Sequence, residues 1–180
     1  MLHLVRHAAV TVRPEADSSL WHLSPEGRAA ADALASEPLW QRVQVIASSP
    51  EPKAAGTAQR IAASHGLPLR LERDLREVGG RAWVGDGYEE LVRRYFAGED
   101  VGWEPRAAAL ARVRACIEAI ASTAQGDVAV VSHGLVLTLY AANVLAFDGT
   151  AAFELWGRIR FPDVCMIESG TGRVVRAFGV

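Results

Sequence analysis

The residues best suited to chemistry in this chain follow the ends of three short apolar runs. Guanidinium and ammonium groups bind phosphate oxygens, and a histidine ring nitrogen can attack phosphorus. Side chains of these kinds, or hydroxyl groups, follow each run, so the pattern predicts a site that binds and transfers an anion. The groups are Arg6-His7 after the run 2–5, Ser48-Ser49-Pro50 with Lys53 after the run 43–47, and Ser132-His133-Gly134 after the run 128–131.

Phosphoryl transfer needs positive charge around the phosphate oxygens, a nucleophile, and an acid that protonates the leaving oxygen. Arg6 can bind two oxygens through its planar fork, and Lys53 brings its charge to the first turn of a predicted helix. The acid is predicted to be Glu77, which follows a short strand. We expect neither a metal ion nor another cofactor, because no segment has the spacing of a metal site. Neighbouring alternatives for the acid are Glu72, Glu89 and Glu90.

The elements that must position these residues alternate between strand and helix. Ser24-Pro25-Glu26 and Ser49-Pro50-Glu51 each mark a helix start, with serine as N-cap and proline at the first helical position. The alternation predicts an α/β fold, a three-layer α/β/α sandwich with a mostly parallel central sheet. Ligands of such sheets bind beyond the carboxyl ends of the strands, where the three groups fall. Strands are expected at 2–5, 43–47, 67–71, 128–132, 164–168 and 173–178, and helices at 24–36, 49–65, 88–97, 105–123 and 134–147.

Length and composition fit one domain over residues 1–180 with a sizeable core, since 50% of the residues are hydrophobic. The net charge of −2 gives no footprint for nucleic acid or a membrane surface, so any anion binding must be local. No signal-peptide pattern opens the sequence, and the cytoplasm is the expected location. Cys116 and Cys165 are expected to be small buried thiols, with a disulfide as the alternative. The sequence does not predict the oligomeric state.

In this order, the motifs resemble those of the histidine phosphatase superfamily, the phosphoglycerate mutase-like group. The resemblance runs from residue 4 to residue 134, and it implies the three-layer fold expected above. The matching segments are Val5-Arg6-His7-Ala8, Leu23-Ser24-Pro25-Glu26-Gly27-Arg28, Ser48-Ser49-Pro50-Glu51-Pro52-Lys53 with Thr57-Ala58, Glu77, and Val131-Ser132-His133-Gly134.

The resemblance implies a role for each matching residue. His7 would form a phosphohistidine intermediate, and Glu77 would act as general acid and then as base. Two positions depart from the family pattern: Ala8 replaces a glycine, and Lys53, the only lysine of the chain, replaces an arginine. A lysine keeps the charge but loses the bidentate contact, which puts rate and substrate choice in question. The residues expected to bind phosphate are Arg6, Lys53, His133 and Arg13.

The function that the resemblance implies is a phosphomonoesterase acting on a small phosphorylated metabolite. Phosphoglycerate mutase-like phosphoryl transfer is an alternative, although mutases generally carry a longer insertion than the 55 residues between Glu77 and His133. A phosphohistidine-protein phosphatase is another. A non-catalytic module that binds a phosphorylated ligand is the alternative from a different class.

The segment 78–105 is expected to set specificity. Arg81 and Trp83 are candidate lid residues, because they follow Glu77 directly and lie outside the next predicted helix. That helix has apolar residues at the spacing of a face that packs on a core, which favours packing over ligand binding. These residues are Tyr88, Leu91, Val92, Tyr95 and Phe96.

Overall fold

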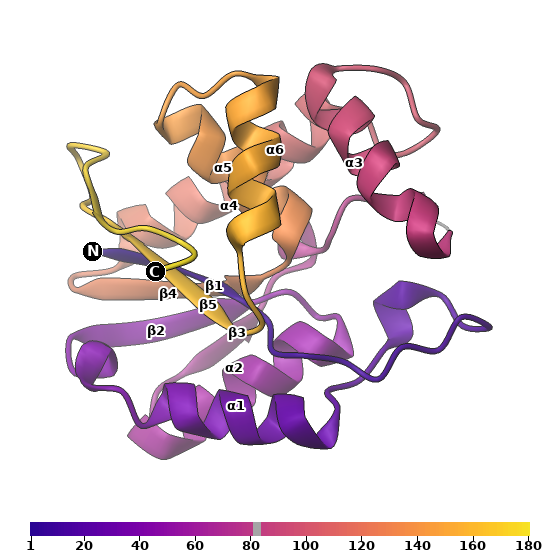
Figure 1. Cartoon of the computed structure of the whole chain (residues 1–180). Helices are drawn as coiled ribbons and strands as arrows, with labels where there is room; N and C mark the ends of the chain where they lie inside the picture. Colours follow the sequence, from indigo (N-terminus) through magenta and orange to yellow (C-terminus); the bar gives the residue numbers. More distant parts are fainter. Residues whose placement is uncertain (81–83) are drawn as a thin grey trace.

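A six-stranded sheet forms the centre of the computed structural model, which describes residues 1–80 and 84–180 (Figure 1). Its strands lie in the order β3-β2-β4-β1-β5-β6. The pairs β1–β4, β4–β2 and β2–β3 are parallel, whereas β5 runs antiparallel to β1 and to β6. The prediction of an α/β fold with a mostly parallel sheet is therefore confirmed. The strands are β1 (Leu2–Arg6), β2 (Val43–Ser48), β3 (Leu69–Leu71), β4 (Asp127–Ser132), β5 (Asp163–Ile167) and β6 (Val174–Arg176).

Helices cover both faces of this sheet. Figure 1 shows α1 and α2 on one side and α3 to α6 on the other. Successive residues of the central strands belong alternately to the two hydrophobic cores. Leu4 and Val130 belong to the core under α3 to α6, and Val5 and Val131 belong to the core over α1 and α2. The central strands are apolar on both faces for this reason. The helices are α1 (Pro25–Ala35), α2 (Pro52–His65), α3 (Tyr88–Ala97), α4 (Arg106–Thr123), α5 (Gly134–Val144) and α6 (Gly149–Arg158).

Helix α2 begins later than the sequence predicts. Its first residue is Pro52, and its N-cap is Glu51. Ser49 does not cap the helix, because its hydroxyl accepts a hydrogen bond from the backbone N–H of Glu51 (3.2 Å) and closes a turn before the helix. Lys53 still lies in the first turn, as predicted. The later start leaves the Glu51 side chain free to turn toward the candidate site.

The helix predicted at 134–147 is also corrected. It ends as α5 at Val144, and Ala146 then adopts a left-handed backbone conformation with φ of 53°. Helix α6, which the sequence pattern does not predict, starts where the Asp148 carboxylate accepts a hydrogen bond from the N–H of Ala151 (2.9 Å). An aspartate in this position is a standard N-cap.

Two further predictions can be compared with the structure: the state of the two cysteines and the packing of the apolar face of α3. Cys116 and Cys165 are both free, which confirms the prediction of unpaired thiols, but only Cys165 is buried as predicted, whereas Cys116 is partly exposed. Burial raises the pKa of each thiol to about 11. Val92, Tyr95 and Phe96 are buried in the core under α3, so the packing interpretation of this helix face holds for them.

No helix of the described residues is long and apolar enough to cross a membrane.

One buried histidine makes stability depend on pH. His3, in β1, is fully buried, and its Nε2 atom lies 3.5 Å from Oδ2 of Asp127. Burial lowers the pKa of His3 below the usual 6.5. As the pH falls, the unfolded chain therefore takes up a proton at this residue before the folded protein does, and the free energy of unfolding decreases below about pH 6.5.

Replacing His3 by leucine is expected to reduce this loss, since leucine cannot be protonated in either state. Urea unfolding of wild type and His3→Leu at about pH 7.5 and about pH 5.5 measures it. His22 is exposed, and His22→Leu serves as the matched control that keeps the wild-type pH dependence. An acid loss that is undiminished in His3→Leu would contradict the prediction.

Candidate active site

The three groups predicted from the sequence meet at one edge of the sheet. In the parallel ladders, Arg6 at the end of β1 pairs with Ser132 at the end of β4, and Ser48 at the end of β2 pairs with Val131. A cavity of about 720 Å³ opens beyond these ends. Four of its lining residues belong to the predicted groups, namely Arg6, His7, Lys53 and Gly134, and the predicted acid Glu77 lines it as well.

Two predicted residues have other positions. His133 is fully buried and is not part of the described cavity lining, and its ring centre lies 5.2 Å from that of His7 in an edge-on arrangement. Arg13 is exposed and is absent from the described lining of the cavity. The candidate lid residues Arg81 and Trp83 lie outside the described residues.

His7 lines the cavity, and a contact with the backbone defines which of its ring nitrogens carries the proton. Its Nδ1 atom lies 2.8 Å from the carbonyl oxygen of Ala8, and since a carbonyl oxygen only accepts, Nδ1 carries the proton of the neutral ring. The nucleophilic lone pair is then on Nε2. The backbone is fixed as well, because the Ala8 N–H donates to the Thr57 hydroxyl (3.0 Å), which itself donates to the Lys53 carbonyl (2.8 Å). Such an arrangement prepares a histidine for attack on an electrophile.

The departure at Ala8 has a structural explanation. A glycine is required only where φ is positive or a side chain has no room, and Ala8 is not among the residues with positive φ. Its methyl group is fully buried and packs in a small cluster with Leu23 and Ala31. An alanine therefore fits this position and adds apolar contact to the start of α1.

Arg6 is a buried cation at the floor of the cavity. It donates from Nη1 to the carbonyl of Ile159 (2.5 Å), and its guanidinium lies 3.4 Å above the ring centre of Phe161. Burial lowers the pKa of Arg6 to about 10, so it stays charged at neutral pH. Gly134 makes room for it, because a Cβ atom there would lie 3.1 Å from Nη2 of Arg6. Arg6 is thus positioned to bind an anion at the start of α5.

Glu77 is held at the N-terminus of the same helix. Its Oε1 accepts hydrogen bonds from the N–H groups of Val78 (3.0 Å) and Val136 (3.1 Å), and its Oε2 accepts one from Leu135 (3.0 Å). Among the four carboxylates that the sequence leaves open, Glu77 and Glu89 line the cavity, whereas Glu72 and Glu90 do not. Only Glu77 is also buried. Glu77 is therefore the one of these four carboxylates that both lines the cavity and is buried.

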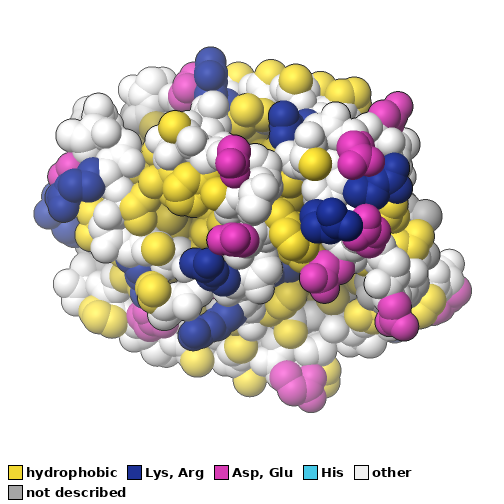
Figure 2. All heavy atoms as spheres, turned by 45° about the horizontal axis from the view of Figure 1, so that its top comes forward, with side chains coloured by type: hydrophobic (Ala, Val, Ile, Leu, Met, Phe, Trp, Pro, Cys, Tyr) yellow, Lys and Arg dark blue, Asp and Glu magenta, His cyan; other side chains and the backbone are white. Residues whose placement is uncertain are grey.

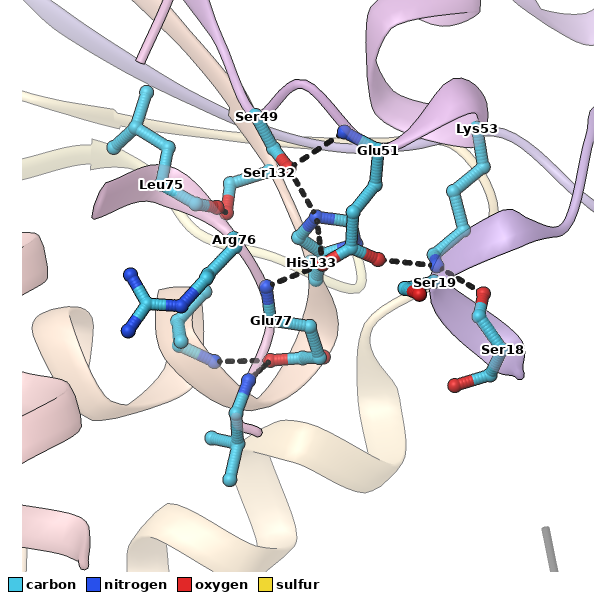
Figure 3. Close-up of polar contacts among 12 residues, drawn as sticks. Ser18, Ser19, Ser49, Glu51, Lys53, Leu75, Arg76, Glu77, Ser132 and His133 are labelled. Atoms are coloured by element: carbon cyan, nitrogen blue, oxygen red, sulfur yellow. Dashed lines mark hydrogen bonds and ion pairs between the residues drawn. The ribbon is translucent and has the colours of Figure 1, made fainter. Parts of the chain in front are cut away.

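Glu51 connects the remaining groups of the site (Figure 3). Its Oε2 accepts a hydrogen bond from Nζ of Lys53 (2.6 Å), which also donates to the Ser18 carbonyl (2.6 Å). Its Oε1 accepts from the Glu77 N–H (2.8 Å) and lies 3.5 Å from Nε2 of His133. The charge of Lys53 is therefore balanced inside the protein before any ligand binds.

Sequence reasoning gave no role to two residues that hold the site together. Glu51 was visible only as a member of its motif, two positions before the sole lysine. Arg112, in α4, donates to the carbonyls of Asp74 (2.7 Å), Arg76 (2.8 Å) and Glu77 (3.0 Å), and so fixes the segment that carries Glu77. Nothing distinguishes Arg112 from the other seventeen arginines in the sequence.

The buried Lys53–Glu51 pair leads to a stability prediction, since the two side chains are only 6% and 10% exposed. Lys53→Met leaves the Glu51 carboxylate buried without its cation, and is expected to lower the free energy of unfolding by about 3 kcal/mol. The double variant Lys53→Met, Glu51→Gln removes both charges and is expected to regain about half of that loss or more. Urea unfolding of the two single variants and the double variant measures the coupling.

The exposed pair Arg114–Glu118 provides the control for this cycle, because its side chains are 54% and 62% exposed. Exposed ion pairs contribute little, so the same cycle there is expected to show almost no coupling. Simple additivity of the Lys53 and Glu51 effects would contradict the prediction.

The fold and this arrangement of residues define a protein class. The sequence profile of the histidine phosphatase superfamily (branch 1) matches residues 2–158. The chain belongs to that superfamily, and it is an enzyme of the histidine phosphatase type. A search of curated proteins gives no significant match.

Solved structures agree on the fold. A mycobacterial glucosyl-3-phosphoglycerate phosphatase in complex with VO3 has a TM-score of 0.80 at 20% identity, over 99% of this chain and 98% of that chain. YhfR of Bacillus stearothermophilus has a TM-score of 0.78 at 19% identity, over 99% and 96%. A phosphoserine phosphatase from Entamoeba histolytica, in complex with 3-phosphoglyceric acid, has a TM-score of 0.75 at 18% identity, over 99% and 96%.

Proposed function

We propose that this protein is a phosphomonoesterase that transfers the phosphoryl group of a small phosphorylated metabolite to His7 and then to water. The observation that carries the proposal is the geometry of His7. Its Nδ1–H is bound to the Ala8 carbonyl, so the lone pair is on Nε2, and His7 and Arg6 both line the cavity. Two of the similar structures named above are phosphatases, one of them in complex with 3-phosphoglyceric acid, and they support this class of substrate.

The first step forms a bond from Nε2 of His7 to phosphorus, while the bond from phosphorus to the alcohol oxygen breaks. Arg6 binds the phosphate oxygens and stabilises their charge. Protonated Glu77 gives its proton to the leaving oxygen, which departs as the free alcohol. Oε2 is the oxygen suited to carry this proton, since it accepts one of the three backbone hydrogen bonds and Oε1 accepts two.

The second step reverses these roles. Glu77, now a carboxylate, takes a proton from water, and the water oxygen attacks phosphorus. The bond from phosphorus to Nε2 breaks, which releases inorganic phosphate and restores neutral His7. His133 lies beside His7 and close to Glu51, and we assign it to the support of the phosphoryl group together with Arg6 and Lys53. The reaction needs no metal ion or cofactor, because these side chains supply the nucleophile, the positive charge and the proton. We assign the protein to the cytoplasm.

The test is phosphate release by the wild-type enzyme from p-nitrophenyl phosphate and a panel of phosphorylated metabolites, in the presence of a chelator. Alkaline quenching during turnover, followed by peptide mass spectrometry, is expected to find a phosphoryl group on His7, since phosphohistidine survives alkali and is lost in acid. Transfer between two hydroxyl groups without phosphate release would identify a mutase instead. Ligand binding without any turnover would identify a binding module.

A further inference from the structure

The outer part of the cavity has an aromatic wall. It is built by the start of α3 and by α6, on the face of the molecule in Figure 2, where hydrophobic side chains reach the surface between charged ones. Phe153 and Trp156 of α6 stack with their ring centres 6.0 Å apart and at an interplanar angle of 19°, and Tyr88 of α3 lies 6.1 Å from Trp156. All three line the cavity. The alcohol part of a substrate would therefore lie against aromatic faces.

The charges of this outer part are acidic. Among the described lining residues, Arg6, Lys53 and Glu77 belong to the phosphate end, and the other two charged residues are Glu89 and Glu154. Each of these directly follows an aromatic residue of the wall, Tyr88 or Phe153. Lys53 does not compensate them, because Glu51 already balances it at 2.6 Å.

Among the described residues, one cation approaches this end of the cavity. Arg158 lies 3.3 Å from Glu154, but it is itself 68% exposed and is not part of the described lining. An exposed pair of this kind is weak, so the carboxylate remains open to a ligand. A second anionic group on the substrate would meet two like charges here, whereas a cation would meet carboxylates and aromatic faces together. Aromatic faces attract cations, and quaternary ammonium groups in particular.

We propose that the substrate is a phosphate monoester whose alcohol part carries a cationic nitrogen and no second anion. The inference rests on the proposed function, since it assigns the alcohol half of the ester that His7 and Arg6 would cleave. The cavity of about 720 Å³ has room for such a group beyond the phosphate. The expected ligand thus differs from the 3-phosphoglyceric acid bound by the Entamoeba histolytica enzyme, which carries a carboxylate.

The test compares two esters of the same shape, phosphocholine and 3,3-dimethylbutyl phosphate, of which only the first carries a positive charge. We expect kcat/KM for phosphocholine to exceed that of the neutral ester by about tenfold, and calorimetric Kd values to differ in the same direction. 3-Phosphoglycerate is expected to be a poorer substrate than either. In the double variant Glu89→Gln, Glu154→Gln, the ratio of kcat/KM for phosphocholine to kcat/KM for 3,3-dimethylbutyl phosphate is expected to fall to about two or less.

Controls separate this inference from the proposed function. Glu118→Gln neutralises an exposed carboxylate of α4 outside the described cavity lining, and is expected to keep the wild-type ratio. Trp156→Leu is expected to lower the ratio, because leucine preserves apolar contact without an aromatic face. A ratio of one in the wild type, or a preference for 3-phosphoglycerate, would overturn the inference. Failure to hydrolyse any ester, p-nitrophenyl phosphate included, would instead contradict the proposed function, while the Kd ratio would still decide the inference.

Discussion

Replacing His7 by asparagine is expected to lower kcat for phosphate release by about 10⁴-fold or more, because the nucleophile of the first step is lost. Asparagine can still hydrogen-bond to the Ala8 carbonyl, so the local backbone is expected to survive. Steady-state phosphate release from p-nitrophenyl phosphate measures the effect. The variant should also carry no alkali-stable phosphoryl group after quenching.

His22→Asn makes the same change at an exposed histidine and is expected to keep wild-type turnover. Thermal unfolding of both variants shows that a loss of activity does not come from a loss of structure. Turnover in His7→Asn within about tenfold of wild type would exclude His7 as the nucleophile.

The second large effect is expected from Glu77→Gln, and it should depend on the leaving group. An amide cannot supply the proton, so kcat for an alkyl phosphate is expected to fall by about 10²- to 10⁴-fold. p-Nitrophenolate is a good leaving group that needs no protonation, so the first step with p-nitrophenyl phosphate should still occur. It should appear as a burst of p-nitrophenolate equal in amount to the enzyme. Turnover after the burst should be slow, since the variant has no base to activate water. Stopped-flow absorbance follows both phases.

Glu72→Gln is the matched control, because Glu72 lies in the same segment and outside the described cavity lining. It is expected to show wild-type turnover with both esters. Equal losses for the alkyl and the nitrophenyl ester in Glu77→Gln, without a burst, would contradict a role in proton transfer. They would indicate instead that Glu77 only supports the start of α5, where it accepts hydrogen bonds from Leu135 and Val136.

Local patterns were sufficient for most of the fold. The apolar run before Arg6 and the run before His133 each became a parallel strand buried on both faces, within a residue of the expected bounds. Helix α3 spans Tyr88–Ala97 as the pattern predicts. These elements follow from neighbours in sequence, through periodicity and residue type, and long-range contacts only reinforced them.

The errors occurred where a choice between two local options was settled by a single side chain. Serine and glutamate can both precede a helix, and Ser49 was expected to cap α2. Instead, its hydroxyl accepts a hydrogen bond from the Glu51 N–H in a turn and lies 2.8 Å from Nε2 of His133. The apolar sequence continues through α5 toward residue 147, yet Ala146 turns to positive φ and α6 begins. Neither the turn at Ser49 nor the end of α5 changes the hydrophobic periodicity of the sequence.

The sequence by itself determined the class of fold, the strand ends that carry Arg6, His7 and His133, and the choice of phosphoryl chemistry. Only the tertiary structure decided that Glu51 would balance Lys53, that Arg112 would hold the segment of Glu77, and that α6 would add aromatic and acidic residues to the cavity. The physical reason is the range of the interactions. Helix and strand formation depends on residues a few positions apart, whereas ion pairs, buried carbonyl contacts and cavity walls join residues whose separation in sequence carries no pattern.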